Sequence, residues 1–90
     1  MIYPFMTLKD NTEVAHTEKL SDGTVKVFFE KADITDGFHS AVCILPECIW
    51  EDVDGFSKDE MNYFENYIKS ISHLIIEFAE KGGFENATKE

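Results

Sequence analysis

The longest run of regular hydrophobic spacing in the chain lies between Ser57 and Phe84. Apolar side chains recur there every three or four residues, and no proline interrupts them. An α-helix turns about every 3.6 residues, so this spacing places the apolar positions on one face. The pattern predicts one long amphipathic helix over about residues 58–81. Its apolar stripe consists of Met61, Phe64, Ile68, Ile71, Ile75 and Phe78.

Both ends of this predicted helix carry their own signals. The hydroxyl of Ser57 can accept a hydrogen bond from an amide of the first turn. Glu60, three residues on, can reach back to the amide of Ser57 and complete a capping box. At the other end, Gly82 and Gly83 predict a stop, with Gly83 in the left-handed region.

Before the helix, apolar and polar residues alternate, which is the pattern of β-strands with one buried face. Pro4 has no amide hydrogen for a strand ladder, so the first strand is expected either at an edge of the sheet or with its pairing beginning after Pro4. Asp22-Gly23 predicts a type I′ hairpin between the second and third strands. The four predicted strands cover residues 2–8, 13–20, 24–30 and 38–45.

The strand at 38–45 is the most apolar, with Val42 and Ile44 on one side and apolar residues on the other as well. A strand that is apolar on both sides is usually an interior strand, or one that is covered on both faces. After Pro46, residues 48–50 are expected to continue in extended form, and residues 51–55 are expected to form an acidic turn.

The expected fold is a single α+β domain over residues 1–90. A four-stranded antiparallel meander (β-β-β-β-α) carries the helix on one face, and residues 85–90 form a frayed tail. One helix covers one face of a sheet, which leaves apolar side chains on the other. This surplus predicts an interface, and the alternative is that Trp50 and residues 31–37 fold over that face. The surplus residues are Phe28, Cys43, Leu45 and, outside the helix stripe, Tyr63 and Ile76.

The charge of the chain narrows the choice of partners. Its 90 residues include 18 acids and eight lysines but no arginine, for a formal net charge of −10. This balance argues against direct binding of nucleic acid, and against docking on an anionic membrane. It suits a basic protein partner or mimicry of a polyanion. Lysine without arginine, with many Ile, Phe and Asn, is also typical of AT-rich bacterial or phage genomes.

The location expected from the sequence is the cytoplasm. No stretch approaches the ~20 apolar residues of a membrane span, and Met1–Pro4 lacks the cationic start of a secretory signal. Two cysteines are too few for a disulfide framework.

Three residues carry potential site chemistry: His16, His39 and Cys43. Cys43 and Cys48 have the spacing C-x4-C, but a structural zinc ion needs four ligands and no second pair is present. The sequence around Asp52 and Asp54 does not fit a calcium loop, because carboxylates are missing at both ends. We therefore expect no metal, no cofactor and no catalytic residue.

The acidic stretch from Glu47 to Glu65 is the most distinctive surface feature of the sequence. It interleaves Trp50 and Phe56 with carboxylates, a combination suited to recognising a basic protein, although it also fits an ordinary helix start with both aromatics in the core. The carboxylates closest to Trp50 are Glu51, Asp52 and Asp54.

Three functions are compatible with these features. The first is a non-catalytic protein that acts through protein–protein interaction, as a homodimer or homo-oligomer or as a regulatory partner of another protein. The second is a polyanion mimic that inhibits a basic nucleic-acid-binding protein. The third is a small ligand-binding protein or enzyme that uses His16, His39 and Cys43.

Overall fold

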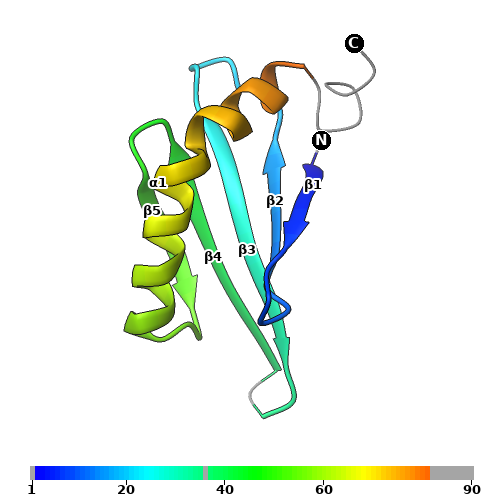
Figure 1. Ribbon diagram of the computed structural model, residues 1–90, viewed down its shortest axis with the longest axis vertical. Coiled ribbons are helices and arrows are strands. Elements are labelled where there is room, and N and C mark those ends of the chain that lie inside the picture. Colours follow the sequence, from blue (N-terminus) through cyan, green and yellow to red (C-terminus); the bar gives the residue numbers. More distant parts are fainter. Residues whose placement is uncertain (1, 36, 82–90) are drawn as a thin grey trace.

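The computed structural model describes residues 2–35 and 37–81, which form an α+β fold with one antiparallel sheet and one helix (Figure 1). The strands lie side by side in chain order. The elements are β1 (Ile2–Thr7), β2 (Glu13–Thr17), β3 (Val25–Asp33), β4 (Gly37–Leu45), β5 (Ile49–Asp54) and α1 (Lys58–Glu80). The predicted fold class is confirmed, but the sheet has five strands and not four.

The additional strand is β5: the sequence predicts extended structure over residues 48–50, but an acidic turn over residues 51–55. Ile49 pairs with Ile44, and the strand continues to Asp54, which pairs with Ser40. An irregularity interrupts this pairing, and Asp52 there has a φ of 53°. Charged residues and bulges are common on edge strands because they discourage pairing with another chain. The acids of residues 51–54 are therefore compatible with a strand at the edge of the sheet.

The turn between β2 and β3 is longer than the predicted two-residue hairpin. β2 ends at Thr17 and β3 begins at Val25. The amide of Gly23 donates to the carbonyl of Leu20, and only Gly23 of the Asp22-Gly23 pair has a positive φ, of 86°. A type I′ turn needs positive φ at both central residues, so that prediction is wrong. This geometry is that of a type I turn followed by a left-handed glycine.

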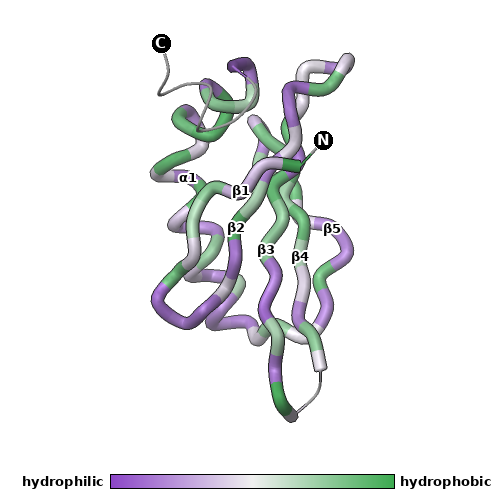
Figure 2. Tube along the Cα trace, turned by 90° about the vertical axis from the view of Figure 1, so that its right-hand side faces the viewer, coloured by the Kyte–Doolittle hydropathy of each residue, from purple (hydrophilic) through white to green (hydrophobic). Residues whose placement is uncertain are grey.

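At the other end of the sheet, the β3–β4 hairpin extends past its neighbours (Figures 1 and 2). The last pair between β2 and β3 is Glu13 with Glu30, whereas β3 and β4 stay paired as far as Asp33 and Gly37. Ile34, near the tip of this hairpin, is fully exposed. The predicted edge position of β1 is confirmed, since β1 pairs with β2 alone.

The helix begins as predicted. Glu60 N–H donates to Ser57 Oγ at 3.1 Å and Ser57 N–H donates to Glu60 Oε1 at 2.9 Å, which completes the capping box. The fully buried helix residues Phe64, Ile68 and Ile75 belong to the predicted stripe. The predicted stop at Gly82-Gly83 lies outside the described residues.

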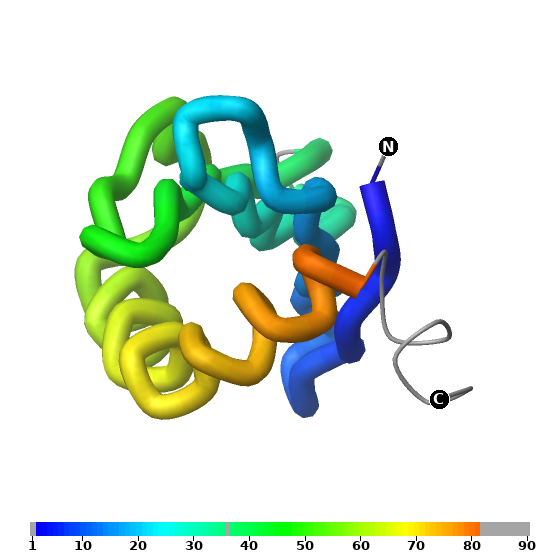
Figure 3. Tube along the Cα trace, turned by 90° about the horizontal axis from the view of Figure 1, so that it is seen from above, coloured from blue at the N-terminus to red at the C-terminus, as the bar shows by residue number. Residues whose placement is uncertain are grey.

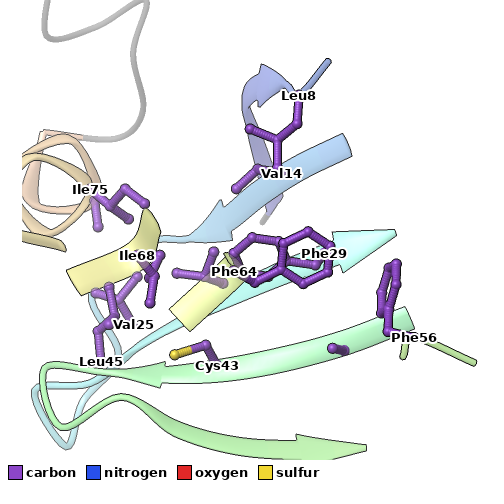
Figure 4. Close-up of a cluster of buried hydrophobic side chains, with 13 residues drawn as sticks. Leu8, Val14, Val25, Phe29, Cys43, Leu45, Phe56, Phe64, Ile68 and Ile75 are labelled. Carbon is purple, nitrogen blue, oxygen red and sulfur yellow. The ribbon is translucent and has the colours of Figure 1, made fainter. Parts of the chain in front are cut away.

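The core lies between α1 and one face of the sheet (Figure 4). Seen from above, the strands follow an arc whose open side is closed by α1 (Figure 3). Phe29 of β3 stacks on Phe64 of α1 with ring centroids 4.8 Å apart, and Phe56 meets Phe64 edge to face at the same distance. These three rings connect the sheet, the start of the helix and the turn before it.

The structure also corrects which face of the sheet Cys43 and Leu45 occupy. Both are fully buried under α1, where they pair with Val27 and Val25. Phe28 pairs with Val42 and so lies on the opposite face. Successive side chains of a strand alternate between faces, so Cys43 and Leu45 cannot share the face of Phe28 once this register is set.

Candidate functional site: the open face of the sheet

The face of the sheet opposite α1, here called the open face, carries a row of apolar side chains. Ala15, Phe28 and Val42 are neighbours across β2, β3 and β4, and each is only partly buried. Beside them, Ile44 pairs with the exposed Ile49. In the part of the chain that the structure describes, no helix or strand lies over this face (Figures 1 and 3). The apolar row is therefore accessible.

Carboxylates form a second row beside the apolar one. Glu13 pairs with Glu30, Glu30 with Ser40, and Ser40 with Asp54, across β2 to β5. Glu51 stands opposite Val42 at the end of the apolar row. Like charges in neighbouring positions of a sheet repel each other, so this arrangement costs stability unless a cation comes close.

A groove lies where the acidic row meets the extended β3–β4 hairpin. Its volume is about 400 Å³, which is within the range of ligand pockets. The residues that line it combine two carboxylates with an aromatic ring that is 54% exposed. They are Asn11, Glu13, Glu30, Ala32 and Phe38.

Neither edge of the sheet is well suited to accept another strand. β1 contains Pro4, which has no amide hydrogen to donate, and its register shifts between Pro4 and Met6. β5 carries the irregularity at Asp52 and several exposed acids. A partner is therefore better accommodated on the open face than by extending the sheet.

The remaining residues predicted for an interaction surface are spread over different places. Glu51, Asp52 and Asp54 are exposed on β5. Trp50 is half-buried on the helix side, with its ring 5.4 Å from that of Phe29, and Ile76 packs against the core. Trp50 therefore does not cover the open face. Residues 31–33 belong to the extended hairpin, so they do not cover that face either.

The two histidines and the cysteine considered for catalysis or ligand binding do not meet. His16 and Cys43 both pair with Val27, one on each side, which places their backbones about 10 Å apart. His39 lies four residues before Cys43 on the same strand, which is about 13 Å along an extended chain. All three residues are buried. Because Cys43 is this far from each histidine, the structure brings together no cysteine–histidine dyad from this set.

Each histidine has its own environment. The ring of His16 lies 5.7 Å from that of Tyr3 and 6.3 Å from that of Phe5, and its Nδ1 is 2.8 Å from the carbonyl of Thr17. His39 packs edge to face against Phe56, with ring centroids 5.4 Å apart. His16 therefore packs against aromatic side chains of β1, and His39 packs against the turn that leads into α1.

Cys43 and Cys48, whose C-x4-C spacing was considered for zinc, lie in contact with each other. The Sγ of Cys43 donates a hydrogen bond to the Sγ of Cys48 at 3.4 Å. Burial raises the pKa of the Cys43 thiol, and the neighbouring Cys48 and Glu65 add to this effect. Within residues 2–35 and 37–81, no three His, Cys, Asp or Glu side chains are grouped so that they could hold a metal ion.

Sequence reasoning missed most of the residues that form the open-face site. Val42 and Ile44 are on one side of their strand as expected, but Phe28 was grouped with the wrong partners. The sequence does not single out Glu13, Glu30 and Phe38, because they are far apart in the chain and only the strand register makes them neighbours. The alternation of polar and apolar residues in each strand was the available signal, and it does not fix the register between strands.

Comparisons with known proteins do not assign this site. A scan against models of protein families found no match, and searches of curated proteins and of solved structures found no similar chain. In the part of the chain that the structure describes, no helix is long and apolar enough to cross a membrane.

Proposed function

We propose that this chain is a non-catalytic interaction domain that binds an amphipathic, basic segment of a partner protein on its open face. The observation that carries the proposal is the apolar row of Ala15, Phe28 and Val42, which borders a row of carboxylates. Apolar surface that stays in water on a small protein often marks an interface. The occupant that fits this face is apolar on one side and positively charged at its flank.

Charge supports a different protein as the partner, and not a second copy of this chain. A symmetric dimer through the open face would bring the Glu13 and Glu30 carboxylates of both copies into one interface. Each copy also has a formal net charge of −10. Complementary charge, by contrast, speeds association with a basic partner and favours it over other proteins.

The groove beside Phe38 supplies the contact that would fix the position of the partner. A lysine or arginine side chain placed there has Glu13 and Glu30 as ion-pair partners, and the ring of Phe38 as a surface for its cation. Adjacent apolar residues of the partner would then lie on Phe28 and Val42. The proposed role of the groove is to select a basic residue, while the apolar row supplies most of the affinity.

The proposal is tested by mapping where a defined probe binds. The probe is a synthetic helical peptide with leucines along one face and lysines along the other, titrated into isotope-labelled protein while amide NMR signals are recorded. We expect the largest shifts at Phe28, Val42 and Phe38. Phe38→Ser is expected to weaken binding by about tenfold, which corresponds to roughly 1.4 kcal/mol.

Tyr63→Ser is the matched control, because Tyr63 on α1 is 52% exposed, close to the 54% of Phe38. It should leave binding unchanged. Shifts that map to the helix side, or equal losses for both variants, would contradict the proposal. A polyanion mimic would behave differently, since its binding would depend on the carboxylates and not on Phe38.

A further inference from the structure

The β4–β5 turn places two thiols close enough to react with each other. Cys43 is the third-last residue of β4, and Cys48 immediately precedes β5. Their sulfur atoms are 3.4 Å apart. A disulfide bond is about 2.0 Å long, so the sulfurs need to approach by a little over an ångström, which side-chain rotation can supply.

The surroundings give the two thiols different reactivity. Cys43 is fully buried under α1, whereas Cys48 is partly exposed. An oxidant from solvent therefore reaches Cys48 first. The backbone of Cys48 has a φ of 61°, which is uncommon for a residue other than glycine, asparagine or aspartate.

We propose that Cys43 and Cys48 form a peroxide-oxidisable thiol pair, which a hydroperoxide converts into an intramolecular disulfide and thiol reductants restore. In the first step, the Cys48 sulfur bonds to one peroxide oxygen while the O–O bond breaks. The Cys48 thiol proton passes to the departing oxygen, which leaves a sulfenic acid and one molecule of alcohol or water. In the second step, the Cys43 sulfur attacks the Cys48 sulfur, and the S–O bond breaks. The Cys43 proton leaves with the hydroxide as water, so two thiols and one peroxide give one disulfide, one alcohol or water, and one water.

The pairing has a protective consequence. A sulfenic acid without a neighbouring thiol is open to further oxidation, which is irreversible in most proteins. Cys43 lies in contact with Cys48, so its attack competes with that further oxidation. The high pKa of the buried Cys43 thiol slows this attack at neutral pH and makes it faster as pH rises. This inference does not depend on what binds to the open face.

The test uses the full chain, fully reduced and then exposed to hydrogen peroxide. The protein is then denatured in the presence of an alkylating reagent, which labels every free thiol, and its intact mass is measured. We expect a monomer that has lost both alkylatable thiols and two hydrogen atoms, and that regains both thiols after treatment with dithiothreitol. Two thiols that remain alkylatable, a cross-linked dimer, or Cys48 sulfinic acid as the main product would each overturn the proposal.

Two variants separate the roles of the cysteines. Cys43→Ala keeps the exposed thiol, and under the same exposure it should accumulate overoxidised Cys48. Cys48→Ser keeps the buried thiol, which should react at least about tenfold more slowly than Cys48 does in Cys43→Ala. Equal reaction rates in the two variants would overturn the assigned order of attack. If either variant fails to fold, the mass measurement on the wild-type protein still tests the proposal by itself.

Discussion

At the scale of single residues, the close contact between Gly55 and His39 depends on a glycine with a positive φ. Gly55 has a φ of 89° directly before the segment that leads into α1, and a Cβ built there would collide with the ring of His39. That ring packs in turn against Phe56. The absence of a side chain at position 55 therefore allows the chain to pass close to His39 of β4 as it leaves β5 towards α1.

Gly55→Ala is expected to destabilise the protein more than Gly23→Ala. Both glycines have positive φ, near 89° and 86°, so both substitutions carry similar backbone strain of about 1–2 kcal/mol. Only position 55 adds a steric clash, since nothing lies within 4 Å of a Cβ at position 23. The clash is expected to cost a further 1–3 kcal/mol or so. Urea unfolding of both variants measures the difference, and equal losses would contradict the close approach of His39.

Asp22, in the β2–β3 turn, makes a pH-dependent contribution to the stability of the fold. Hydrogen bonds from the side chain and the amide of Thr24 hold the pKa of Asp22 below its usual value of 3.8. A carboxyl with a lowered pKa stabilises the fold above its usual pKa, and this contribution is lost as pH falls through the folded-state value.

Asp22→Asn should therefore lower the urea midpoint at pH 7, where Asp22 is ionised, and the difference from wild type should shrink as pH falls below the usual carboxyl pKa of 3.8. Asparagine keeps the size of the side chain, so the comparison isolates the charge. Midpoints measured over a pH series provide the readout. A difference that persists at low pH would show that the loss comes from geometry and not from ionisation.

At the scale of elements, α1 combines a local start signal with a tertiary role. The capping box is made entirely by residues 57–60, so it is available before the helix meets the sheet. The face of α1 that bears Phe64, Ile68 and Ile75 needs the sheet, because an amphipathic helix in water owes most of its stability to packing.

Ser57→Ala should destabilise the protein by about 1 kcal/mol, because the first turn loses its acceptor. Ser70→Ala is the control, since the Ser70 hydroxyl donates only to the carbonyl of Tyr67 within the same helix and is exposed. Its effect should stay within about 0.5 kcal/mol. Equal effects in chemical denaturation would mean that the capping box does not contribute to stability.

At the scale of the whole molecule, one helix covers one side of a five-stranded sheet, and the other side bears an apolar row that borders a row of carboxylates. The formal net charge of −10 opposes self-association, whereas the apolar row favours it. The balance between the two depends on salt, because ions screen charges beyond about 10 Å at 0.1 M.

Light scattering across a dilution series should therefore give the mass of one chain at low ionic strength. At high salt the mass should rise with concentration, because screening removes the repulsion and leaves the apolar contact. Val42→Asn should abolish this rise. A dimer at low salt that persists on dilution would mean that the open face pairs with a second copy, as the sequence also allowed.

The sequence alone determined the features that depend on neighbours in the chain. The helix and its capping box, the edge position of β1 and the antiparallel α+β class all follow from local spacing or from single residues such as Ser57 and Pro4. Strand β5 was missed because its acids resemble a turn, and they are tolerated only because the strand lies at an edge.

Only the tertiary structure decided which residues meet. The register of β3 against β4 placed Cys43 and Leu45 under the helix and Phe28 beside Val42. The register of β2 against β3 brought Glu13 to Glu30, next to the groove that Phe38 lines. The physical reason is that a shift of one residue between strands exchanges the two faces, and alternation within a single strand leaves that shift open.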